Sequence, residues 1–183
     1  SHESADETVT AQDVKALERS IQSSVSAARF LALTVRPQRM HSAKAKLIEN
    51  YQLHPVSFDE LLLRHLKQHC STMKKPPDWQ VVLKADAMEQ TARGWQNLQR
   101  LVQRVLPDMA AEIRGINKPI LLTEPGLIAR YGLINTWLNG LRQELESGNF
   151  GHSLILLVAS DAQQTGAHID GNMVPHGAGS SQF

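Results

Sequence analysis

The hydrophobic pattern of the chain centres on two apolar runs, Pro119–Leu122 and Ser153–Asp161. Both runs are nearly continuous in aliphatic residues, as in strands that are buried on both faces. The stretch between them has apolar residues at helical spacing: Ile134, Trp137, Leu138, Leu141 and Leu145. This order predicts a strand, a crossover helix and a second strand parallel to the first.

The segments before residue 72 continue the alternation of helices and strands. Phe30–Val35 is rich in apolar and β-favouring residues and ends at Arg36-Pro37, so we predict a strand, placed centrally in the sheet. His54–Val56 is a further short extended piece. Three helices are predicted around these strands, the last with a capping box at Ser57 and Glu60: Thr10–Ala28, Met40–Tyr51 and Phe58–Thr72.

The segment from Lys74 to Ile113 is harder to assign from its pattern. Lys74–Asp78 contains a Pro-Pro pair and is predicted to be a loop. We interpret Trp79–Lys84 as a strand, with Asp86 as a possible strand-end residue. A helix is expected from Trp95, interrupted or kinked at Pro107.

Together these elements predict an α/β fold of three layers, with a mostly parallel central sheet flanked by helices, Rossmann-like in outline. We expect residues 1–9 to be a tag remnant or disordered, residues 10–165 to form a single domain, and residues 166–183 to form a hairpin and a loose tail. Asp170-Gly171 supplies the positive φ that the hairpin turn needs. Gly132 and Gly148 are expected to end helices.

Composition narrows the class of protein. The 19 Lys and Arg nearly balance the 18 Asp and Glu, so there is no overall field that would attract nucleic acid or an acidic membrane. The single Cys70 excludes an internal disulfide framework, and no run is long enough for a membrane span. We therefore expect a soluble, cytoplasmic domain.

Motifs for catalysis and nucleotide binding are absent from the sequence. A phosphate-binding loop needs glycines followed by Gly-Lys-Ser/Thr, and a dinucleotide fold needs Gly-x-Gly-x-x-Gly after its first strand. The Gly-x-Ser-x-Gly elbow is also missing, and nothing flanking Cys70 would activate its thiol. The pattern at Thr123–Gly126 fits a tight strand-to-helix turn better than a ligand loop. We expect no cofactor, and we do not predict an enzyme from these motifs.

The best place for a site is the carboxyl edge of the sheet, where ligands bind in open parallel folds. The residues expected there form a candidate cleft of Arg36, Glu124 and Asp161. A carboxylate pair such as Glu124 and Asp161 can hold a divalent metal or share a proton. The alternative is structural, since polar residues at strand ends often satisfy backbone groups of the next helix.

Two further groups of side chains have a chemical and a structural interpretation. His65 and His69 are four residues apart on one helix face, a spacing that can chelate a metal, but the Glu of His-Glu-x-x-His is missing and we predict no metal site. A basic cluster is a candidate for contact with phosphate or DNA, although a solvated face is the favoured interpretation: Arg36, Arg39, Lys44 and Lys46.

Five stretches together resemble one known family. The resemblance is to the C-terminal region of the large multidomain kinase and ATPase proteins of bacterial phage-growth-limitation (BREX-type) defence systems, and it covers residues 28 to 175. The stretches that carry it are Phe30–Pro37, Pro55–Leu62, Asp78–Asp86, Pro119–Tyr131 and Leu156–Asp161. In that family, kinase and ATP-binding signatures lie upstream of this region, and this chain contains neither.

The resemblance implies a terminal accessory module. Its partners would be the kinase and ATPase regions of its own parent chain and other defence proteins, with DNA as a further possibility and no membrane. Our leading hypothesis is therefore a non-catalytic interaction module serving phage defence. The alternatives are a nucleotide- or metal-binding enzyme domain that uses the candidate cleft, and a DNA-contacting domain that uses the basic cluster.

Overall fold

The computed structural model describes residues 3–159, 168–169 and 172–173. The chain divides into two compact units. Unit 1 is Ser1–Phe58 with Ile116–Phe183, and unit 2 is Asp59–Gly115. The expectation of a single domain over residues 10–165 stays a prediction.

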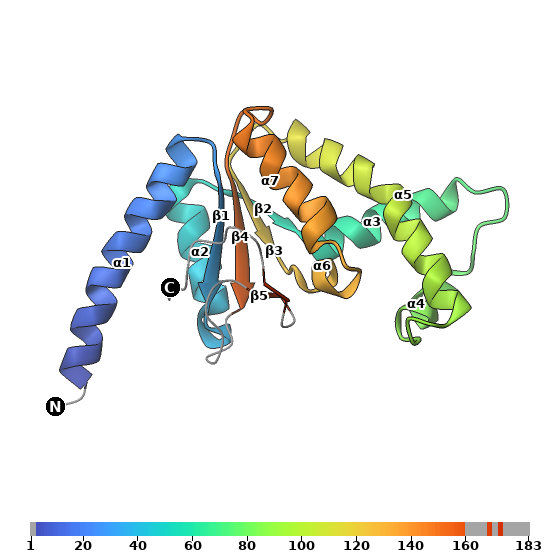
Figure 1. Ribbon diagram of the computed structural model, residues 1–183, viewed down its shortest axis with the longest axis horizontal. Helices are drawn as coiled ribbons and strands as arrows, with labels where there is room; N and C mark the ends of the chain where they lie inside the picture. The colour runs from blue at the N-terminus through green and yellow to red at the C-terminus, as the bar shows by residue number, and fades with distance from the viewer. Residues whose placement is uncertain (1–2, 160–167, 170–171, 174–183) are drawn as a thin grey trace. The chain divides into compact units, whose positions relative to one another are not determined.

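A four-stranded, all-parallel sheet forms the centre of unit 1 (Figure 1), as predicted for an α/β fold. The strands run in the order β1-β4-β3-β2. Their bounds are β1 (Phe30–Val35), β2 (His54–Ser57), β3 (Ile120–Thr123) and β4 (Leu154–Ala159). The two apolar runs of the sequence are therefore neighbours, with Ile120 opposite Leu154 and Leu122 opposite Leu156.

One detail of this arrangement differs from expectation. β1 was predicted to be central, but it lies at one edge of the four-stranded sheet, beside β4. Its six residues are nonetheless all buried, which explains why its composition resembles that of an inner strand. β2 forms the other edge, where Pro55 is tolerated because an edge strand can lack one backbone donor.

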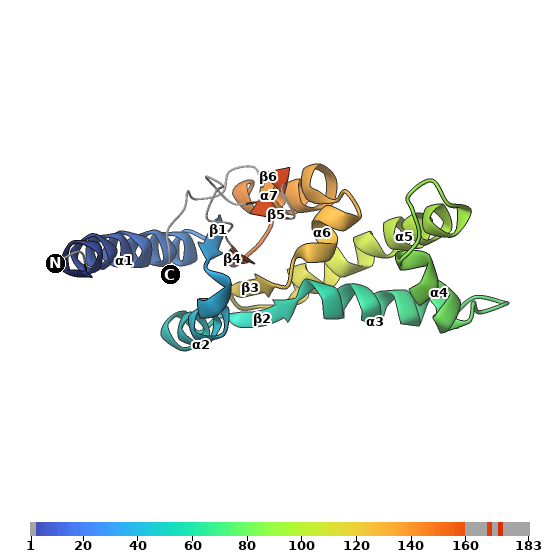
Figure 2. The same ribbon diagram turned by 90° about the horizontal axis from the view of Figure 1, so that it is seen from below.

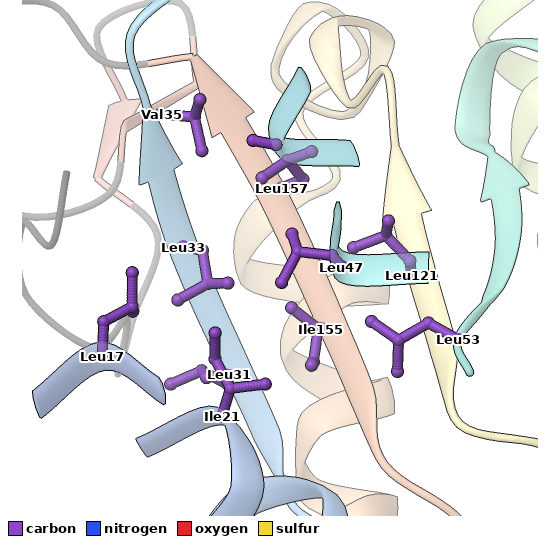
Figure 3. Close-up of a cluster of buried hydrophobic side chains, with 11 residues drawn as sticks. Leu17, Ile21, Leu31, Leu33, Val35, Leu47, Leu53, Leu121, Ile155 and Leu157 are labelled. Atoms are coloured by element: carbon purple, nitrogen blue, oxygen red, sulfur yellow. The ribbon is translucent and has the colours of Figure 1, made fainter. Parts of the chain in front are cut away.

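One face of the sheet is covered by two helices, α1 (Glu3–Ser26) and α2 (Met40–Tyr51). Alternate residues of β1 point to this face, because side chains alternate along a strand. Figure 3 shows Leu31 and Leu33 packed with Leu17 and Ile21 of α1. The rest of this core cluster is Val35, Ala43, Leu47, Leu53, Leu121, Ile155 and Leu157.

The opposite face is covered by the crossover between β3 and β4 (Figure 2). Its elements are α6 (Gly126–Arg130), the π-helical turn η2 (Ile134–Leu138) and α7 (Asn139–Glu146). The predicted helical stripe is buried throughout, including Trp137 and Leu145. The ring of Trp137 packs against Phe58, with centroids 5.2 Å apart. The sheet therefore lies between two helical layers, which confirms the three-layer prediction.

Backbone conformation explains where several helices end. Gly132 after α6 and Gly148 after α7 have φ of 68° and 81°, as predicted for helix-ending glycines. Ala28 after α1 and Gln52 after α2 adopt the same left-handed region without being glycine. α1 begins at Glu3, before its predicted start at Thr10.

Unit 2 is helical, and one prediction for it was wrong. It contains most of α3 (Phe58–Ser71), then α4 (Trp79–Asp86) and α5 (Arg93–Gly115). Trp79–Lys84 forms the start of α4 and not a strand, because the Asp78 side chain accepts a hydrogen bond of 3.0 Å from the Gln80 amide and so caps a helix. Asp86 consequently lies at a helix end.

α5 continues as one helix through Pro107, so the interruption that was expected there is absent, while the alternative of a kink stays a prediction. Its buried residues recur at helical spacing on both sides of the proline, among them Leu98, Val105, Met109 and Ile113. Packing of this long apolar face compensates for the backbone hydrogen bond that Pro107 cannot donate.

The remaining described residues form two short strands, β5 (His168–Ile169) and β6 (Asn172–Met173), which pair antiparallel as in a hairpin. The predicted tail lies outside the described residues. Among the described helices, none is both long and apolar enough to cross a membrane.

Candidate functional site

The carboxyl ends of the parallel strands bring two of the predicted site residues, Arg36 and Glu124, to one edge of the sheet. Arg36 follows β1, Ser57 ends β2 and Glu124 follows β3. β4 lies between β1 and β3, so two strand spacings, about 10 Å in all, separate the backbones at Arg36 and Glu124. Asp161, the third residue of the candidate cleft, lies outside the described residues.

The side chain of Glu124 is held toward the β2 edge of the sheet. Ser57 Oγ donates a hydrogen bond to Glu124 Oε2, and the two residues are 67 apart in the sequence. Next to them, Thr123 Oγ1 donates to the Val56 carbonyl at 3.4 Å. Because β2 is the neighbour of β3 on the side away from β1, this bond directs the carboxylate away from Arg36.

The backbone of Glu124 adopts an unfavourable conformation. Its φ is 51°, in the left-handed region that costs a non-glycine residue about 1–2 kcal/mol. Such a conformation persists only where the surroundings impose it, and non-glycine residues of this kind are concentrated at functional sites. Ser57 was predicted only as a helix cap, and the pairing of β2 with β3 gives it this second role.

In the connection after β1, backbone amides donate hydrogen bonds to carbonyls of the same turn. It forms a 3₁₀ turn, η1 (Pro37–Arg39), in which the Arg39 amide donates to the Arg36 carbonyl at 2.9 Å. The Met40 amide donates to the Pro37 carbonyl, and Pro37 has no amide hydrogen. In the described part of the chain, the Arg36 side chain makes no hydrogen bond or ion pair.

The basic cluster is divided between elements. Arg36 precedes η1 and Arg39 ends it, while Lys44 and Lys46 belong to α2. Residues two positions apart on a helix do not face each other, so Lys44 and Lys46 project in different directions. The four side chains therefore do not form a single face.

The two histidines of α3 are not brought together around a metal site. His65 Nε2 lies 3.1 Å from Glu112 Oε1 of α5, and Arg64 forms two hydrogen bonds with the same carboxylate. Nε2 of His69 is buried and has no hydrogen-bond partner within the described residues. No group of three metal-ligating side chains occurs in the part of the chain that the structure describes.

Two pKa shifts follow from the packing of unit 2. Hydrogen bonding to the Arg64 guanidinium lowers the pKa of Glu112, and His65 contributes in the same direction. Burial raises the pKa of the Cys70 thiol, which leaves less of the reactive thiolate at neutral pH. The first shift marks an ion pair that joins α3 to α5, and the second agrees with a structural role for Cys70.

Comparison with known proteins gives one relative. No model of a known protein family matches the chain, and no solved structure matches it. The chain is similar to the probable kinase PglW of Streptomyces coelicolor. The two are 30% identical over 191 residues, which cover 98% of this chain and 12% of PglW. The chain thus spans about an eighth of PglW's length, and the resemblance drawn from the sequence is confirmed to this extent.

Replacing Glu112 tests the ion pair in unit 2. At pH 7, Glu112→Gln should lower the free energy of unfolding by up to about 1 kcal/mol, because the pair is partly exposed. Because the pKa of Glu112 is lower in the folded protein than in the unfolded chain, the ion pair stabilises the fold at pH values above the unfolded pKa of about 4.5. This stabilisation is lost as the pH falls through the folded-state pKa. Urea unfolding followed by circular dichroism from pH 7 to pH 3 should therefore show the difference between wild type and variant shrinking with acid.

Glu49 provides the matched control, since it is exposed on α2 and forms no ion pair within the described residues. Glu49→Gln should change the unfolding free energy by less than about 0.5 kcal/mol at every pH. A Glu112→Gln difference that stays constant down to pH 3 would contradict the assigned pKa shift.

Replacing Glu124 tests its backbone conformation. Glu124→Ala removes the bond from Ser57 and keeps the left-handed strain, whereas Glu124→Gly removes both. The Gly variant should therefore be more stable than the Ala variant by about 1 kcal/mol in urea unfolding. At the exposed helical position Ala45, wild-type alanine should be more stable than Ala45→Gly by a similar amount. Equal or lower stability of Glu124→Gly relative to Glu124→Ala would disprove the strain.

Proposed function

We propose that this chain is a non-catalytic interaction module at the C-terminal end of a larger bacterial protein of phage defence. The module packs against other regions of its parent protein and against other proteins of the defence system. The similarity to PglW supports this proposal, because nearly the whole chain corresponds to a small share of a much longer probable kinase.

The observation that carries the proposal is the connection between β1 and α2. In nucleotide-binding α/β domains, the loop after the first strand presents free backbone amides to phosphate groups. Here η1 contains no glycine, and the amides of Arg39 and Met40 donate to carbonyls of the same turn. Pro37 contributes no donor at all. Two of the backbone amides that could meet a phosphate here are therefore already bonded within the turn.

The distribution of exposed apolar side chains supports a role in protein contacts. Among the described residues, the exposed large hydrophobic side chains all belong to unit 2. They are Leu63 of α3, Val81 and Leu83 of α4, and Met88 just after α4. Val81 is the most exposed of them, at 57%. Their concentration in one unit favours that unit as the protein-contacting part of the chain.

A second candidate function is favoured by Glu124. Its strained backbone and its place at the carboxyl edge of the sheet are typical of ligand-binding residues. Under this alternative, Glu124 holds a nucleotide-bound or free divalent cation after release from Ser57. The arrangement of Ser57 and Glu124 also has a structural explanation, because it joins β2 to β3.

Nucleotide assays separate the two candidates. For the 183-residue chain with Mg-ATP, we expect phosphate release equal to a protein-free blank and no saturable binding of a fluorescent ATP analogue. Glu124→Gln should leave both readouts unchanged. Turnover above the blank that Glu124→Gln abolishes would contradict the first proposal and establish the second.

Phage challenge of cells that express the full-length parent protein tests the interaction role. Val81→Asp, at the most exposed of these side chains, should lower phage resistance at least tenfold in plaque counts, because a charge would enter a protein contact. Gln90→Asp, at an exposed polar position after α4, makes the same change in charge, and this matched control should keep resistance. Full resistance of the apolar-to-Asp variant would exclude this contact.

A further inference from the structure

The exposed face of α5 carries a line of arginines. Arg93, Arg100 and Arg104 are all exposed, and at 100° per residue they lie within about 40° of one another around the helix. At a rise of about 1.5 Å per residue, the line extends roughly 16 Å along the axis. The opposite face of α5 is the apolar stripe that is buried in unit 2.

These arginines have no acidic partner among the described residues. Arg100 donates only to the amide oxygen of Asn97, at 3.3 Å, and the side chains of Arg93 and Arg104 make no hydrogen bond or ion pair within the described part of the chain. Arg64 and Arg142, in contrast, are each paired with a glutamate. No described ion pair therefore engages the arginine line, although the chain as a whole is nearly neutral.

The residues between the arginines are polar and can also contact a polyanion. The exposed positions beside them are occupied by Gln96, Asn97 and Gln103, whose amide groups can donate to phosphate and sugar oxygens. From Arg93 to Pro107 the helix has no Asp or Glu, and the first acidic residue is Asp108. A polyanion could thus follow four turns of α5 without meeting a like charge.

We propose that this face of α5 binds the phosphodiester backbone of a nucleic acid without reading its sequence. Arginine forms paired hydrogen bonds to phosphate oxygens, and a regular polyanion can occupy all three guanidinium groups at once. This surface differs from the basic cluster at residues 36–46, whose lysines diverge around α2. It belongs to unit 2 alone and does not depend on the proposed protein contacts.

Fluorescence anisotropy with labelled 20-nucleotide probes tests the proposal. The probes are a mixed-sequence DNA duplex and a single-stranded RNA, which identify the preferred source of phosphates. In about 50 mM salt, replacing Arg93, Arg100 and Arg104 by Gln should weaken binding at least tenfold. It should also reduce the slope of log affinity against log salt by about 2 to 3, or roughly one for each lost phosphate contact.

The variants are chosen so that folding does not decide the result. Gln has a helix propensity close to that of Arg, and unfolding curves of the triple Gln variant should match wild type. The triple Lys variant keeps the charge and should retain affinity within about threefold. A control with the same loss of charge, Lys15→Gln, Arg19→Gln and Lys118→Gln, should change affinity less than threefold.

Four results would overturn the proposal. The first is that wild type binds neither probe at 20 mM salt, and the second is that the α5 Gln variant binds as tightly as wild type. The third is that the Arg36→Gln, Arg39→Gln double variant loses affinity while the α5 variant keeps it. The fourth is that polyglutamate competes as well as nucleic acid at equal charge, which would make the partner an acidic protein surface.

Discussion

The structure of unit 1 depends on the burial of β3 and β4 as parallel neighbours. All four residues of β3 and the first five of β4 are buried, and helices cover both faces of the sheet. Each fully buried aliphatic side chain contributes about 1.5–3 kcal/mol relative to an exposed one. Side chains of this kind make the parallel arrangement stable despite the long crossover that it requires.

The same arrangement determines what the carboxyl edge can do. β4 separates β1 from β3, so Arg36 and Glu124 share an edge without being neighbours. β2 lies on the other side of β3, and this brings Ser57 to Glu124. Parallel sheets often bind nucleotides at this edge. Here the 3₁₀ turn after β1 forms hydrogen bonds within itself, and the Glu124 carboxylate that follows β3 accepts a hydrogen bond from Ser57 of β2. These features support the proposed interaction module.

The sequence predicted the parts of the fold that depend on local pattern. Continuous apolar runs predicted β3 and β4, and the glycines at 132 and 148 predicted two helix ends. The left-handed conformation of Ala28 and Glu124 could not be predicted, because neither residue type favours it. Trp79–Lys84 has strand-like composition, but the Asp78 cap and the burial of helically spaced side chains favour α4.

The candidate site was predicted less well, since it depends on strand order. The rule for parallel sheets placed Arg36 and Glu124 at one edge, and the structure agrees. The bond between Ser57 and Glu124 joins residues 67 apart, so no local signal in the sequence indicates it. The arginine line of α5 was not predicted, and its lack of acidic partners appears only in three dimensions.

The most direct test of this account is the register of β3 against β4, measured by nuclear Overhauser effects in the isotope-labelled chain. Contacts that link Ile120 with Leu154 and Leu122 with Leu156, in the same chain direction, are expected. Contacts in the reversed order, which pair Ile120 with Leu156 and Leu122 with Leu154, would show antiparallel strands. The shared carboxyl edge and the account of its side chains would then be wrong.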